Sequence, residues 1–113
     1  SYDSRGLVYL RLGKAAQARN DYATALKLQP ERATALFGRG IAELRLKQID
    51  KATADIRQAR TIDPEIDDIY ILAGVLQEGC RRGDAPCDLP AVLRPQPKDN
   101  RSYLSVSRRY GAP

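Results

Sequence analysis

Few side chains in this sequence could carry out chemistry. The chain of 113 residues contains no histidine, methionine or tryptophan. The lack of histidine excludes histidine-based acid–base catalysis, Ser-His-Asp and Cys-His nucleophile pairs, and zinc sites that need imidazole. The carboxylates of Asp67 and Asp68 are the basis for an enzyme hypothesis, but acids are ordinary in the first turn of a helix. We therefore predict a protein that is not an enzyme and that uses no cofactor or metal.

The two cysteines, Cys80 and Cys87, could form a disulfide. They bracket a polar loop in which Gly83 and Pro86 supply the turn that a small ring needs. The spacing permits a disulfide without requiring one, so two free thiols in a reducing cytosol are the alternative. A disulfide predicts an oxidising compartment such as the bacterial periplasm, and free thiols predict the cytoplasm.

Positive charge is concentrated in the C-terminal third of the chain. Residues 1–79 carry 12 basic and 11 acidic side chains, whereas residues 80–113 carry 7 basic and 3 acidic ones. Basic side chains interleaved with Tyr103 and Tyr110 would suit weak nucleic-acid binding. These charges are spread among prolines, which favours a solvated tail over a nucleic-acid site. No apolar run is long enough to predict a membrane span.

The sequence repeats itself with a period of about 34 residues, which identifies the elements that position these side chains. In a third copy, Gly74 stands in the register of Gly6 and Gly40, and Tyr70 stands in the register of Tyr2 and Leu36, before the copy breaks off. The matched pairs are Gly6 and Gly40, Arg5 and Arg39, Leu12 and Leu46, Ala18 and Ala52, Ala25 and Ala59, Leu28 and Ile62, and Pro30 and Pro64.

Each copy is predicted to form two short helices. Apolar residues recur at spacings of three and four, and their phase changes once within each copy. Small residues at the matched positions would let two helices cross closely. Gly13 is a candidate for the end of the first helix, and Asp63-Pro64-Glu65 has the N-cap, proline and acid of a helix start.

The repeated positions form a pattern of large, small and aromatic side chains that resembles the tetratricopeptide repeat family. The resemblance covers residues 2–79, about two and a half repeats, and implies an all-α, right-handed helical-hairpin solenoid. Arg5 and Arg39 depart from it where leucine is usual, and Glu43 and Ile56 depart from it where aromatic residues are usual. The matching residues are Tyr2, Gly6, Tyr9, Ala18, Tyr22, Ala25 and Pro30, then Leu36, Gly40, Ala52, Ala59 and Pro64.

The resemblance also implies that the first helix of each hairpin lines a concave groove. The groove should bind an apolar or amphipathic segment of a protein partner, with arginines meeting its acidic flanks. The asparagines and lysines with which some members of the family grip a terminal carboxylate are missing from this face. We expect a protein–protein interaction module that is part of a longer protein. The expected groove residues are Leu7, Leu10, Arg11, Phe37, Ile41, Leu44, Arg45, Ile71 and Val75.

The chain beyond the repeats offers an alternative occupant. We divide the sequence into a repeat domain, residues 1–79, and a proline-rich basic extension, residues 80–113, which is expected to cap the last helix. Whether this extension also fills the groove stays open, as does the oligomeric state. In the alternative view, the module is a structural appendage of a larger and possibly enzymatic chain. The apolar residues of the extension are Leu89, Ala91, Val92, Leu93, Tyr103, Leu104, Val106 and Tyr110.

Overall fold

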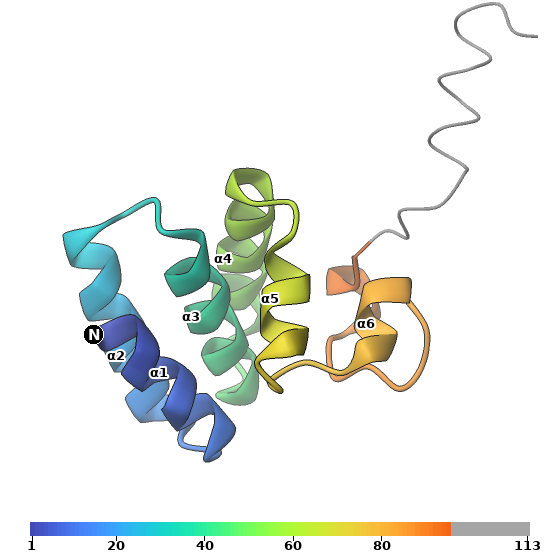
Figure 1. Ribbon diagram of the computed structural model, residues 1–113, viewed down its shortest axis with the longest axis horizontal. Coiled ribbons are helices and arrows are strands. Elements are labelled where there is room, and N and C mark those ends of the chain that lie inside the picture. Colours follow the sequence, from blue (N-terminus) through green and yellow to red (C-terminus); the bar gives the residue numbers. More distant parts are fainter. Residues whose placement is uncertain (96–113) are drawn as a thin grey trace, which may run out of the picture.

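The computed structural model describes residues 1–95, and these residues form helices and connecting turns (Figure 1). No strand occurs among them, which confirms the all-α prediction. None of the helices in this part of the chain is both long enough and apolar enough to cross a membrane. The elements are α1 (Tyr2–Arg11), α2 (Ala15–Leu28), α3 (Ala33–Arg45), α4 (Ile49–Ile62), α5 (Ile66–Leu72), α6 (Glu78–Arg82) and the 3-10 helix η1 (Ala91–Leu93).

The first four helices form two hairpins that lie side by side. Helix α1 packs on α2, α3 packs on α4, and α3 also packs along α2. In Figure 1, α1, α3 and α5 lie on one side of the molecule and α2 and α4 lie behind them. Gly13 turns the chain after α1 with a φ of 78°, as predicted, and Lys47 occupies the matching position after α3 with a φ of 68°. The second hairpin therefore places a lysine in a conformation that favours glycine.

Glycines let the helices of the hairpins approach closely. A Cβ at Gly40 would lie 2.6 Å from Cγ1 of Ile56 in α4, and a Cβ at Gly6 would lie 2.9 Å from the Tyr22 ring in α2. Gly38, on the other side of α3, lies against the same Tyr22 ring with no room for a Cβ. The predicted role of small residues at helix crossings is confirmed at Gly6 and Gly40.

Paired charges explain why arginine replaces leucine in both hairpins. Arg5 donates through Nε and Nη2 to the two carboxylate oxygens of Asp21, both at 2.8 Å. Arg39 makes the same two contacts with Asp55, at 2.8 and 2.9 Å. Such two-point guanidinium–carboxylate pairs fix orientation as well as distance. Because Asp21 and Asp55 are also one repeat apart, each hairpin carries the same link between its two helices.

The third copy departs from the repeat. Although the sequence resembles the repeat as far as residue 79, α5 ends at Leu72 and Gly74 turns the chain with a φ of 80°. The predicted start is close to the observed one, since the Asp63 carboxylate accepts a hydrogen bond from the Glu65 amide at 2.9 Å just before α5. Gly74 therefore ends a helix, although its counterparts Gly6 and Gly40 lie inside one.

A disulfide and two leucines hold the residues that follow α5. Cys80 in α6 is bonded to Cys87, with the two Cα atoms 4.9 Å apart. Leu89 and Leu93 are buried and belong to the same hydrophobic cluster as the residues of α3 and α5. The proposed division after residue 79 falls inside α6 and stays a prediction. Part of the predicted extension lies outside the described part of the chain. This part includes the apolar and aromatic residues from Tyr103 onward and the basic residues from Lys98 onward.

Candidate functional site

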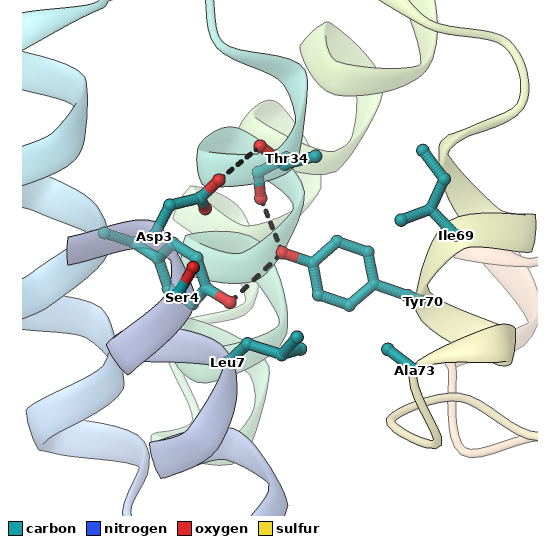
Figure 2. Close-up of a pocket in the computed structure, with 8 residues that line it drawn as sticks. Asp3, Ser4, Leu7, Thr34, Ile69, Tyr70 and Ala73 are labelled. Atoms are coloured by element: carbon teal, nitrogen blue, oxygen red, sulfur yellow. Dashed lines mark hydrogen bonds between the residues drawn. The ribbon is translucent and has the colours of Figure 1, made fainter. Parts of the chain in front are cut away.

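A pocket opens on the side of the molecule formed by α1, α3 and α5. It encloses about 350 Å³ of space that is open to solvent. In Figure 2, side chains of α1 lie on one side of this space and side chains of α5 on the other, with α3 between them. The pocket therefore lies where the first helices of successive hairpins face one another. Its lining residues are Asp3, Ser4, Leu7, Tyr22, Thr34, Ile69, Tyr70 and Ala73.

One end of the pocket is a chain of hydrogen bonds centred on Tyr70. The Tyr70 hydroxyl donates to the carbonyl oxygen of Thr34 at 2.6 Å and lies 3.2 Å from the Tyr22 hydroxyl (Figure 2). The Thr34 hydroxyl donates to Oδ2 of Asp3 at 2.8 Å, and Arg32 donates to the same oxygen at 2.8 Å. These contacts join α1, α3 and α5 across the pocket.

Burial keeps the hydroxyl groups of Tyr70 and Tyr22, the two tyrosines that are hydrogen-bonded at this end of the pocket, protonated. It raises the pKa of Tyr70 well above that of an ordinary tyrosine, and it is also the main cause of the raised pKa of Tyr22. Both phenols are therefore neutral near physiological pH. They can donate and accept hydrogen bonds, but they are unsuited to acid–base catalysis, which requires a pKa near the working pH.

The other end of the pocket is apolar. Leu7 from α1 and Ile69 and Ala73 from α5 line it. The Tyr70 and Phe37 rings pack with their centroids 4.9 Å apart and their planes inclined by 33°. A pocket with an apolar wall and a few fixed polar groups suits an apolar side chain whose backbone or neighbours make hydrogen bonds.

Four of the nine predicted groove residues lie in the core instead. Leu10, Phe37, Ile41 and Val75 are each at most 6% exposed. The expectation that they contact a partner directly is corrected, because side chains so little exposed offer no surface to a second molecule. The physical reason for Phe37 is that Tyr70 packs on its ring and covers it.

The other five predicted residues remain accessible to different degrees. Leu7 lines the pocket, Leu44 and Ile71 are partly buried against the core, and Arg11 is exposed. Arg45 is exposed as well, but its Nη1 donates to the carbonyl oxygen of Leu10 at the end of α1, at 2.6 Å. Arg45 thus links the two hairpins, and nothing in the structure tests a role for any of the five in binding.

The sequence analysis missed the α5 side of the pocket. Extending the period of the repeat predicted that Ile71 and Val75 would line the groove, whereas Ile69, Tyr70 and Ala73 do so. A signal was present in the sequence, because position 72 holds leucine where α3 has the glycine that lies against Tyr22. That difference excludes the same close helix packing and hence the same orientation of α5.

One buried acid lies away from the pocket, within the second hairpin. Glu43 is buried between α3 and α4, and burial together with the neighbouring Asp55 carboxylate raises the pKa of Glu43 to about 8. Oε1 of Glu43 has no hydrogen-bond partner within the described residues. Residues 1–95 also contain no cluster of acids or cysteines that could hold a metal ion.

Comparison with known proteins identifies the repeated hairpins. A family model described as tetratricopeptide repeat matches residues 4–65, which is more than half of the chain. No curated protein and no solved structure matches the sequence significantly. Repeats of this family serve as protein–protein interaction modules and are typically non-catalytic, in keeping with the pocket described above. The matched segment covers the second hairpin and all but the first two residues of the first, and the chain therefore belongs to the tetratricopeptide repeat family.

Proposed function

We propose that the pocket between α1 and α5 binds an apolar side chain from an extended or amphipathic segment of another protein. The observation that supports this proposal is the apolar wall of Leu7, Ile69 and Ala73 beside the fixed hydrogen-bond chain of Tyr70. Burying one leucine-sized side chain contributes about 1.5–3 kcal/mol, so a single anchor would change affinity by tenfold or more. Exposed Arg11 would meet acidic residues that flank the anchor.

A second possibility is that the groove is filled by the chain itself, and the module then serves as a structural appendage. The position of Tyr70 favours a self-filled groove. This side chain of α5 packs on Phe37 and donates a hydrogen bond to the Thr34 carbonyl. The two possibilities differ at Leu7. If the pocket binds an apolar side chain of a partner, affinity for that partner depends on Leu7. If the chain itself fills the groove, Leu7 contributes only to packing within the protein.

The test is a selection of binding peptides from a displayed random peptide library, followed by affinity measurements on variants of the full chain. We expect the selected peptides to share apolar residues and to bind the Leu7→Lys variant at least about tenfold more weakly. Leu12→Lys is the matched control, because Leu12 is exposed in the turn after α1 and lies outside the pocket. Its affinity should not change, and circular dichroism should show that both variants keep their helices.

Two results would count against a partner groove. The library could yield no binder, or the selected peptides could bind the Leu7→Lys and Leu12→Lys variants equally well. Either result would favour the self-filled groove.

A further inference from the structure

The turns that join α1 to α2 and α3 to α4 lie at the same end of the molecule (Figure 1). The two hairpins stand side by side, with α3 packed against both α1 and α2. Residues 11–14 and 45–51 make up this end, which we call the turn edge. They contain one acid, Asp50, and five basic residues, all of them exposed: Arg11, Lys14, Arg45, Lys47 and Lys51.

A hydrogen bond brings two of these positive charges together. Nη1 of Arg45 donates to the carbonyl oxygen of Leu10 at 2.6 Å, so the guanidinium from α3 lies at the last turn of α1. Arg11 is the last residue of that turn. Because a carbonyl oxygen carries no net charge, this hydrogen bond positions Arg45 without neutralising it. Two like charges held at one place favour the binding of an anion there.

No carboxylate within residues 1–95 forms an ion pair with any of the five basic side chains of the turn edge. Arginines elsewhere do have such partners, as Arg5, Arg39 and Arg60 show. The buried carboxyl of Glu43 interacts with Lys51 from a greater distance, but the pKa of Glu43 is about 8. Glu43 is therefore mostly uncharged near pH 7, and the turn edge keeps its positive charge.

Two of the lysines occupy positions that are unfavourable for local stability. Lys47 has a φ of 68° where the first hairpin has Gly13, and this left-handed conformation favours glycine. Lys51 lies in the first turn of α4, where the helix dipole favours an acid over a base. Local strain of this kind is characteristic of functional positions. The stability of the hairpin does not explain either lysine, whereas the binding of an acidic partner explains both.

Aliphatic side chains lie among the basic ones. Leu12 is 63% exposed and Ile49 is 43% exposed. The turn edge contains no aromatic residue, although single-stranded nucleic acids are commonly held by stacking on aromatic rings, and aromatic residues are also frequent at membrane surfaces. Basic and aliphatic side chains together are complementary to a protein segment that contains both acidic and aliphatic residues.

We propose that the turn edge binds an acidic segment of a protein partner, whose carboxylates meet the five basic side chains and whose aliphatic residues contact Leu12 and Ile49. This surface is distinct from the pocket. The hydrogen-bonded end of the pocket includes Asp3 and Thr34, which lie at the beginning of α1 and α3, whereas the turn edge follows the end of these helices. Binding at the turn edge does not require an occupied pocket.

Fluorescence anisotropy with the full chain tests the proposal. The probe is a labelled peptide of glutamate and leucine with glycine spacers, and the comparison peptide has lysine in place of glutamate. We expect the glutamate peptide to bind near pH 7 and low salt, and its affinity to fall as salt screens the charges. The lysine peptide should not bind. Phosphatidylserine vesicles and a single-stranded DNA oligonucleotide serve as probes of the other polyanions.

The decisive variant combines Lys47→Gly with Lys51→Gln. Glycine suits the positive φ at position 47, and glutamine is well suited to the third residue of a helix. The variant should therefore unfold at the same urea concentration as the parent chain or at a higher one. Its affinity for the glutamate peptide should nevertheless fall at least about fivefold, because two charges of the turn edge are gone.

The matched control combines Lys27→Gln with Arg57→Gln. It removes the same net charge from exposed positions in α2 and α4 that lie outside the turn edge. This variant should bind the glutamate peptide as tightly as the parent chain does. Binding that is lost at the turn edge and kept in the control is expected only if the peptide contacts the turn edge itself.

Three results would overturn the proposal. The glutamate peptide could fail to bind at low salt, or the two double variants could weaken its binding equally, which would make net charge the cause. The vesicles or the oligonucleotide could bind more tightly than the peptide and lose affinity in the turn-edge variant, which would assign this surface to another class of partner. Leu7→Lys should not weaken binding of the glutamate peptide, so this proposal and the proposed pocket can fail separately.

Discussion

Residues 1–62 and residues 63–95 are stabilised in different ways. In the first region the same contacts occur twice, one repeat apart, as the Arg5–Asp21 and Arg39–Asp55 pairs show. The contacts that hold the second region have no such counterpart: Tyr70 holds α5, and the Cys80–Cys87 disulfide holds the residues after it. The difference shows that a repeat in sequence becomes a repeat in structure only where the residues at helix crossings also repeat.

A single position makes this comparison concrete. Gly38 in α3 lies directly against the Tyr22 ring, which lets α3 pack closely along α2. Its counterpart one repeat later is Leu72, which is too large for such an approach to α4 and is exposed to solvent instead. Helix α5 consequently has smaller contacts with α3 and α4 than α3 has with α2.

The largest expected effect follows from exchanging the residues at this position. Gly38→Leu should destabilise the protein by at least about 3 kcal/mol, because the new side chain would overlap the Tyr22 ring in a buried contact. Leu72→Gly should cost only about 1 kcal/mol, the usual penalty of glycine in a helix, because Leu72 is exposed. Chemical denaturation followed by circular dichroism measures both.

Equal losses in the two variants would break the comparison. They would mean that α5 packs as tightly as α3, and that the exposure of Leu72 does not reflect its part in folding.

A smaller effect is expected from removing the disulfide. Replacing Cys80 and Cys87 together by serine should cost about 2 kcal/mol, since the bond closes a short loop. The loss should be confined to the second region, because the hairpins of residues 1–62 do not contain the bond. Hydrogen exchange should therefore accelerate for α5 and α6 and stay unchanged for α2 and α3. Faster exchange throughout the hairpins would show that the two regions unfold as one unit.

The smallest effect concerns a place inside the first region where the repeat is broken. Glu43 stands where the first hairpin has Tyr9, and its pKa is about 8 in the folded protein, compared with about 4.5 for an ordinary glutamate. Between these values the unfolded chain releases the proton and the folded chain keeps it. The stability contributed by Glu43 should therefore fall as pH rises from about 4.5 to about 8.

Glu43→Gln should remove this dependence, because glutamine does not titrate. The variant should be more stable than the parent by about 1–2 kcal/mol at pH 8 and nearly equal to it at pH 4.5. Urea denaturation across this pH range measures the difference. A constant difference at all pH values would show that Glu43 is ionised in the folded protein and that its neighbours accommodate the charge.

Much of the first region could be predicted from the sequence. The matched glycines and alanines identified the crossings of the two hairpins, and Gly13 identified the end of α1. The site was predicted less well. Leu7 does line the pocket, whereas Phe37 and Ile41 are core residues, because their exposure depends on how α5 packs against α3. The sequence pattern could not predict that packing.

The sequence by itself determined the two helical hairpins and their repeat, because helix formation depends on residues three and four positions apart and the hairpins recur at one fixed period. Only the tertiary structure decided where the third copy ends and which residues line the pocket. The hydrogen bond at one end of this pocket joins Tyr70 to the Thr34 carbonyl, far away in the sequence, and has no counterpart elsewhere in the described chain. It depends on the volumes of Gly38, Tyr22 and Leu72 together, and such a fit exists only once the helices are packed.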